Sequence, residues 1–249
     1  MSRIADAVRL RAATARHRGD AVACPICEHS FDAFKDDWNR HDALCWRCGS
    51  HERHRAQWLL LQRHPELLRG ARSLLHFSPE WCLRHRLAGS STTFDDDAKL
   101  ATPGLRYVTT DLDPGQEVDL RLDITALDLP DEAFDAVLCS HVLEHVPDDA
   151  RAMAELRRVT ARGGFCLVMV PLALDRAATY EDPSITTPAD RQREYLQFDH
   201  VRLYAPDIAD RLRGAGFDVE TIDMTQEPGV DAERHRLLAS DLIFLCRPR

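Results

Sequence analysis

The sequence predicts an α/β protein with a mostly parallel sheet, preceded by a small N-terminal module built on four cysteines. From about residue 73 onward, short apolar runs alternate with amphipathic segments, a pattern typical of a parallel sheet with crossover helices. Before that point, two Cys-x-x-Cys pairs are separated by seventeen residues. We therefore expect an N-terminal helix and metal-binding module in residues 1–63 and a sheet domain in residues 70–249.

The composition is that of a globular chain, with 44% hydrophobic and 29% charged residues. No apolar run approaches the roughly 20 residues of a membrane span, and the charged N-terminus lacks the apolar core of a secretory signal. We therefore expect a cytoplasmic protein without membrane contact. Residues 1–63 carry 11 basic and 8 acidic side chains, whereas the rest carries 21 and 33. The acidic body argues against nucleic-acid binding, although binding through the N-terminal module alone stays open.

The four N-terminal cysteines have the spacing of a zinc site. Cys24 and Cys27 form one Cys-x-x-Cys turn and Cys45 and Cys48 the other, and two such turns complete a tetrahedron of thiolates. Gly49 allows the chain to turn closely after the second pair. Because four cysteines leave no open position, we expect a structural Zn²⁺. The alternatives are redox or unpaired thiols, or a histidine replacing one ligand, for which the neighbours are His29, His41, His51 and His54.

Periodicity gives the expected elements of the sheet domain. Helices are expected from Ser50 onward and over residues 80–87, 148–160 and 206–214. Residues 171–205 are polar and interrupted by prolines, so we expect an irregular substrate-binding or lid segment. Strands are expected over residues 74–77, 106–109, 118–122, 134–140, 165–170, 217–223 and 241–246.

Two stretches carry a family resemblance. The run from Phe134 to Pro147, FDAVLCSHVLEHVP, resembles the fourth strand and following loop of S-adenosylmethionine-dependent methyltransferases. Residues 157–165, RRVTARGGF, are similar to the R-V-L-K-P-G-G segment of that family. The resemblance covers residues 70–249 and is specific from Asp111 to Pro171. It implies a seven-stranded, mostly parallel Rossmann-like methyltransferase sheet that binds S-adenosylmethionine.

The resemblance also implies positions for the cofactor. Asp111 stands where the family has an acidic residue that accepts the ribose hydroxyls, with Asp113 as the alternative. Asp123 and Ile124 stand where the family contacts adenine. Ser140 and His141 would border the methionine portion. Taken singly, each carboxylate is more typical of a turn or helix cap, but at successive strand ends they favour a ligand site.

The first strand departs from the family pattern. The family has Gly-x-Gly-x-Gly after this strand, whereas the chain has His76-Phe77-Ser78-Pro79-Glu80 and no glycine. Side chains there would crowd the close approach that glycine permits. The amides after Ser78 could still receive the methionine carboxylate, and Glu80 its ammonium group. We therefore predict cofactor contacts from His76, Phe77, Ser78 and Glu80, as in similar zinc-headed members.

Three histidines are candidate bases, since a base is useful when the methyl acceptor must lose a proton. His141 and His145 follow the fourth strand. His200 lies in the long segment beside Asp199, which we also predict to be catalytic. The segment concentrates groups that would either grip a polar substrate or pin the segment to the domain: Tyr195, Asp199, His200, Arg202 and Tyr204.

The sequence thus predicts a methyltransferase acting at oxygen or nitrogen on a small molecule, glycan or peptide natural product. Two alternatives stay open. One is a ribosomal or transfer RNA methyltransferase whose zinc module grips RNA through Arg40, Arg47, Arg53 and Arg55. The other is a non-catalytic interaction module that has lost its glycine loop.

Overall fold

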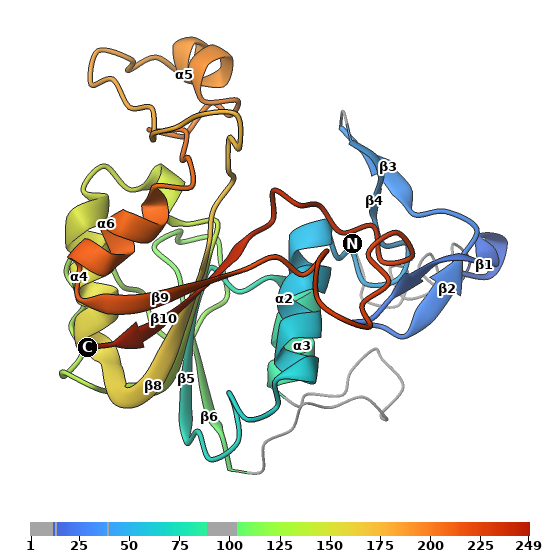
Figure 1. The fold of residues 1–249 in the computed structure, drawn as a ribbon, viewed down its shortest axis with the longest axis horizontal. Coiled ribbons are helices and arrows are strands. Elements are labelled where there is room, and N and C mark those ends of the chain that lie inside the picture. Colours follow the sequence, from blue (N-terminus) through green and yellow to red (C-terminus); the bar gives the residue numbers. More distant parts are fainter. Residues whose placement is uncertain (1–11, 13, 39, 89–103) are drawn as a thin grey trace. The chain divides into compact units, whose positions relative to one another are not determined.

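The computed structural model describes residues 12, 14–38, 40–88 and 104–249 (Figure 1). The chain forms two compact units. The first comprises residues 1–66, 80–103 and 223–239, and the second residues 67–79, 104–222 and 240–249. Segment 223–239, from near the C-terminus, therefore belongs to the cysteine-bearing unit. The expected N-terminal helix falls largely on residues 1–11 and 13, outside the described part.

Two antiparallel hairpins carry the cysteines. Strand β1 (Arg18–Cys24) pairs with β2 (His29–Phe31), and β3 (Lys35–Asp37) pairs with β4 (Arg40–Leu44). Each Cys-x-x-Cys pair lies at the end of one of these strands, and Gly49 has φ +63°, the left-handed conformation expected after the second pair. The sequence analysis predicted none of these strands; two of them, β2 and β3, have only three residues, too few to show a periodicity.

Helix α2 (Glu52–Arg63) forms the core of the first unit together with α3 (Trp81–Leu87). Trp58, Leu60 and Leu61 are buried on α2. Arg55 is also completely buried: its guanidinium donates to the carbonyls of Ala43 and Ser50 at 3.0 and 2.7 Å. It also donates to the carbonyl of His235 at 2.7 Å, which ties segment 223–239 into this unit. Arg55 is thus an internal structural residue.

The second unit is built on a six-stranded sheet (Figure 1). The strand order is β6-β5-β7-β8-β10-β9, and only β10 runs against its neighbours. The expected mostly parallel Rossmann-like sheet is confirmed. The strands are β5 (Ser73–Phe77), β6 (Arg106–Thr110), β7 (Phe134–Ser140), β8 (Thr160–Met169), β9 (Phe217–Ile222) and β10 (Ile243–Pro248).

The expected count of seven strands was one too high in the described part of the chain. Residues 118–122 form only an isolated bridge, between Leu120 and Thr110. Next to it, the Asp119 carboxylate accepts hydrogen bonds from the Thr109 amide and hydroxyl at 2.8 and 2.7 Å. Because side-chain bonds replace the backbone ladder, the segment follows the sheet edge without becoming a strand.

Helices α4 (Asp149–Val159) and α6 (Ile208–Gly214) lie along the same face of the sheet (Figure 1). Met153 and Leu156 of α4 and Leu212 of α6 are buried in one cluster with the sheet residues. This confirms the amphipathic pattern expected for α4. No helix among the described residues is long and apolar enough to span a bilayer.

Residues 171–205 are more ordered than the sequence suggested. They contain α5 (Pro188–Glu194), which buries none of its residues. Two isolated bridges, Leu172 with Tyr204 and Tyr180 with Leu203, hold the two ends of the segment together. The expectation of a wholly irregular stretch was therefore wrong in part.

Candidate functional site

A cavity of about 650 Å³ opens at the carboxyl ends of β5, β6 and β7. Its walls come from the segments that follow these strands and include residues 77–78, 110–113, 116, 122–125, 141–142 and 145–148, together with Asp199. Strand β5 lies between β6 and β7, the next two strands along the chain, so the strand order reverses here; this is the switch point where open α/β sheets bind ligands. The volume suits a small organic molecule.

Two of the predicted carboxylates line this pocket within turns. Asp111 Oδ1 accepts the amide of Asp113 at 2.8 Å. Asp123 Oδ1 accepts the amide and the hydroxyl of Thr125, both at 2.8 Å, and the amide hydrogen bond is the main cause that lowers the pKa of Asp123. The carboxylates therefore cap their own turns and also face the cavity, so the two interpretations are compatible. Ile124, which is buried, lines the pocket beside Asp123.

The loop after β5 keeps a glycine-like turn without a glycine. Ser78 has φ +45°, in the left-handed region that favours glycine. Its amide donates to the Thr110 carbonyl at 2.8 Å, which fixes the turn against β6. Phe77 and Ser78 both line the pocket.

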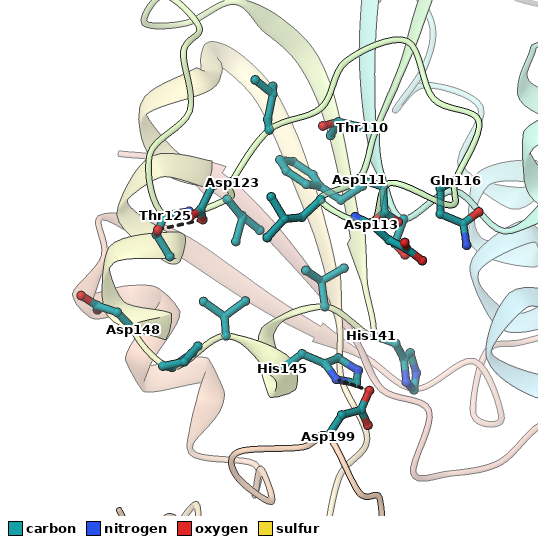
Figure 2. Close-up of a pocket in the computed structure, with 18 residues that line it drawn as sticks. Thr110, Asp111, Asp113, Gln116, Asp123, Thr125, His141, His145, Asp148 and Asp199 are labelled. Carbon is teal, nitrogen blue, oxygen red and sulfur yellow. Dashed lines mark hydrogen bonds and ion pairs between the residues drawn. The ribbon is translucent and has the colours of Figure 1, made fainter. Parts of the chain in front are cut away.

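The histidines form the opposite wall. His141 directly follows β7 with φ +54°, and its Nδ1 lies 3.3 Å from Oε1 of Glu144. His145 ends the 3-10 helix η1 (Leu143–His145), and its Nδ1 lies 3.3 Å from Oδ2 of Asp199. Figure 2 shows His141, His145 and Asp199 together, away from Asp111 and Asp113.

Glu144 and His200 lie behind this wall. Burial alone would raise the pKa of the Glu144 carboxyl, but the neighbouring His141 side chain lowers it. His200 is buried, its Nδ1 lies 3.1 Å from the Tyr195 carbonyl, and its ring centroid is 4.8 Å from that of His145. Burial lowers the pKa of His200, which favours the neutral imidazole.

Eight of the twelve residues predicted for catalysis or cofactor binding line the pocket, and four do not. His76 and Ser140 are buried within their strands, where His76 Nδ1 is 2.8 Å from the Tyr107 hydroxyl. Glu80 belongs to the first unit and lies 3.3 Å from His54. His200 is the fourth. The eight lining residues are Phe77, Ser78, Asp111, Asp123, Ile124, His141, His145 and Asp199.

Arg202, for which the sequence left a substrate-binding and a structural role open, is a structural link. It is 3% exposed and donates to the carbonyls of Leu143, Val146 and Pro147 at 3.0, 2.5 and 2.9 Å. Tyr204 donates to Asp149 at 2.7 Å. Both side chains therefore pin the long segment to the domain, the second of the two roles considered for them. Nothing in the local sequence pairs Arg202 with carbonyls about 55 residues earlier.

The four N-terminal cysteines form one buried cluster. Their sulfurs all lie within 4.8 Å of one another, with Cys24 and Cys48 3.5 Å apart and Cys27 and Cys45 3.6 Å apart. These distances exceed a disulfide bond of about 2.05 Å and approach the roughly 3.8 Å between thiolates around one tetrahedral Zn²⁺. The four residues fit this ion.

Comparisons with known proteins agree with this architecture. Residues 92–168 match the family model described as a methyltransferase domain. A protein of Mycolicibacterium smegmatis named "Probable S-adenosylmethionine-dependent methyltransferase" is 30% identical over 125 residues, which is 50% of this chain and 42% of that protein. A phosphatidylethanolamine N-methyltransferase of Cereibacter sphaeroides is 30% identical over 92 residues, 37% of this chain and 44% of that protein. The chain thus spans less than half the length of either curated relative.

The crystal structure of the [4+2]-cyclase SpnF has the same fold, with a TM-score of 0.51 at 15% identity over 97% of this chain and 92% of that one. This likeness concerns fold alone, since one fold supports different chemistries. Residues 92–168 thus match a methyltransferase domain, and the second unit has a mostly parallel, Rossmann-like sheet, as in methyltransferases, with a pocket at its switch point.

Proposed function

We propose that this protein transfers a methyl group from S-adenosylmethionine to an oxygen or nitrogen atom of a small molecule, glycan or peptide natural product. The observation that supports this most is the convergence of Asp111, Asp123 and His141, each following a different strand or strand-like segment, on one cavity at the switch point of the sheet.

The donor would lie across the ends of β5 and β6. Asp111 would accept the ribose hydroxyls, with Asp113 beside it, and Asp123 the adenine amine, while Ile124 packs against the ring. Ser78 and Phe77 would border the methionine portion, because the left-handed turn at Ser78 brings the backbone to the cavity. When bound, S-adenosylmethionine supplies a sulfonium methyl group; the sulfur–carbon bond breaks as the acceptor bond forms, and its electron pair stays on sulfur.

His141 is the residue that we assign as general base. Its Nδ1 faces the buried Glu144 carboxylate, which favours a proton on Nδ1 and leaves Nε2 to accept the acceptor's proton. Glu144 would act as a positioning residue. His145, paired with Asp199, is the alternative base, since both line the cavity. His200 is behind the wall and does not line it.

The charge of the pocket restricts the acceptor. Five carboxylates line it and no lysine or arginine does among the described residues: Asp111, Asp113, Asp123, Asp148 and Asp199. This environment disfavours an anionic acceptor and favours a neutral or cationic one. It therefore argues against RNA. Of the four arginines proposed to grip RNA, Arg55 is buried and Arg40 is paired with Glu52 at 3.1 Å.

We further propose that the cysteine cluster holds one structural Zn²⁺. Four thiolates would fill its coordination sphere, so the ion would stabilise the fold of the first unit and contact no substrate. The hydroxyl of Ser50 lies 3.2 Å from the Cys24 sulfur and would donate to this thiolate.

Isothermal titration of the full-length, zinc-loaded protein with S-adenosylmethionine tests the proposal. Loss of charge-assisted hydrogen bonds to the ribose should weaken binding by Asp111→Asn about 10- to 100-fold. Asp131→Asn is the control, because Asp131 is exposed, lies outside the pocket and pairs with Arg158. Absence of binding by the wild type, or equal affinities for the two variants, would contradict the proposed donor site. Release of S-adenosylhomocysteine on addition of a cell extract would exclude a non-catalytic interaction module.

A further inference from the structure

Next to the pocket, a second group of ligand-type side chains is formed by His145 of the histidine wall together with Glu144 and His200 behind it. One carboxylate oxygen of Glu144 and one ring nitrogen of each histidine all lie within 4.8 Å of one another. Glu144 and His200 are buried, and His145 is partly exposed at the pocket. We propose that these three residues form a binding site for a divalent first-row transition-metal ion, distinct from the four-cysteine cluster.

The environment of Glu144 is the first argument. Glu144 is 1% exposed, and neither carboxylate oxygen accepts a hydrogen bond from the described residues. Nδ1 of His141 lies 3.3 Å from Oε1, too far for an ideal hydrogen bond. A buried carboxylate ordinarily has its oxygens satisfied by donors, because leaving them unpaired is costly. A cation between Glu144 and the two histidines would satisfy the remaining acceptor capacity.

The histidines already have the outer contacts that metal-binding histidines typically make. His200 Nδ1 lies 3.1 Å from the Tyr195 carbonyl, so a proton on Nδ1 leaves Nε2 available as a ligand. His145 Nδ1 lies 3.3 Å from an oxygen of Asp199, which leaves its Nε2 available in the same way. Donation of the second ring N–H to a carbonyl or carboxylate fixes the tautomer and the ring orientation of a metal ligand.

The backbone around the cluster is held in place before any ion binds. The amide of Val201 donates to the Glu144 carbonyl at 2.9 Å, which joins the two chain segments that supply the ligands. Arg202 holds the carbonyls of Leu143, Val146 and Pro147. Ligands about 2.1 Å from one ion stand about 3–4 Å apart, so the observed separations require only small side-chain movements.

The donor set indicates the kind of ion. Two imidazoles and one carboxylate suit Mn²⁺, Fe²⁺, Co²⁺ or Zn²⁺, whereas Mg²⁺ and Ca²⁺ prefer oxygen ligands only. Three protein ligands leave coordination positions open. Because His145 also lines the pocket, an open position would face the space assigned to the methyl acceptor and could hold one of its oxygens. This role, unlike the ion site itself, rests on the proposed methyltransferase function.

Binding of Mn²⁺ alone is the direct test, because thiolate-rich sites select Zn²⁺ over Mn²⁺. The full-length protein, loaded with one Zn²⁺ per chain, is titrated with MnCl₂ while electron paramagnetic resonance measures the free ion. We expect one further Mn²⁺ per chain. Glu144→Gln keeps the shape of the side chain and removes the charge. It should weaken Mn²⁺ binding more than about 100-fold, since loss of an outer-shell partner alone costs about 10- to 100-fold.

Asp111→Asn is the matched control, because it removes a carboxylate from the same pocket outside the cluster. It should lose affinity for S-adenosylmethionine and keep Mn²⁺, whereas Glu144→Gln should do the reverse. If Glu144→Gln fails to fold, as judged by thermal unfolding and zinc content, the partly exposed His145→Gln decides instead. Wild-type protein that binds no Mn²⁺ beyond the zinc site, or either folded cluster variant that binds it like the wild type, overturns the metal site. If the wild type binds Mn²⁺ but no S-adenosylmethionine, the proposed function is wrong and the ion site still stands.

Discussion

Arg202→Lys is the substitution whose effect the structure specifies most closely. The Arg202 guanidinium is buried and donates to three backbone carbonyls, and its Nε also donates to Glu181 at 2.9 Å. A lysine ammonium has its donors at one point and cannot reproduce this planar fork. At least two of the carbonyl contacts would be lost.

The magnitude follows from these contacts. A hydrogen bond to a charged group contributes about 1.5–3 kcal/mol net, and part of it would be retained by the ammonium. We expect the free energy of unfolding to fall by about 2–4 kcal/mol. For 150–250 residues, each kcal/mol shifts Tm by about 2–4 °C, so Tm should fall by about 5–15 °C.

Differential scanning calorimetry of the two lysine variants Arg202→Lys and Arg193→Lys is the assay. Arg193 of α5 also pairs with carboxylates, but its side chain is 65% exposed. Its replacement should cost at most about 1 kcal/mol. A Tm for Arg202→Lys within about 2 °C of the wild type, or equal losses in both variants, would refute the argument that this buried guanidinium anchors the pocket wall.

Four other predictions follow from single contacts. Ser78→Gly should raise the free energy of unfolding measured in urea by about 0.5 kcal/mol, because it relieves a left-handed φ. Ser78→Val should lower that free energy by about 1 kcal/mol or more, and the reverse order of the two variants would contradict this. Gly164→Ala should destabilise the protein by about 1–3 kcal/mol, because the added Cβ would stand 2.4 Å from a backbone carbonyl oxygen. Gly214→Ala should not destabilise it, since there is open space around Gly214. Chemical denaturation of both variants checks this. Cys45→Ser should lower the zinc content measured by mass spectrometry and increase amide exchange in α2; unchanged exchange would argue against a structural ion. The pKa of Glu155 is lowered, chiefly by a hydrogen bond from Arg158, so the ionised carboxylate stabilises the protein above about pH 4.5 and this stabilisation is lost as the pH falls. The difference in stability between the wild type and Glu155→Gln should therefore shrink below that pH. A constant difference would refute this assignment.

The sequence by itself determined the features that depend on neighbours along the chain. The spacing of Cys24, Cys27, Cys45 and Cys48 sets two turns, and the cluster follows from them. Asp111, after β6, and Asp123 lie at the edge of the sheet where the pocket is, as does the segment after the apolar strand β7. The sheet and the cysteine cluster were predictable because periodicity and turn chemistry are local, and the pocket lies where carboxyl ends of parallel strands meet at one edge.

Only the tertiary structure decided which distant groups meet. Glu144 reads in the sequence as one charged residue of a short loop, and it becomes notable because folding buries it beside His200, more than fifty residues later. From the sequence, Arg202 fitted either a substrate-binding role or a structural one; its burial and its hydrogen bonds to backbone carbonyls show the structural role. Residues 118–122 had a strand-like composition, but Asp119 bonded the neighbouring strand through its side chain. In each case the free energy of the group depends on burial and on partners that are remote along the chain, which no local pattern encodes.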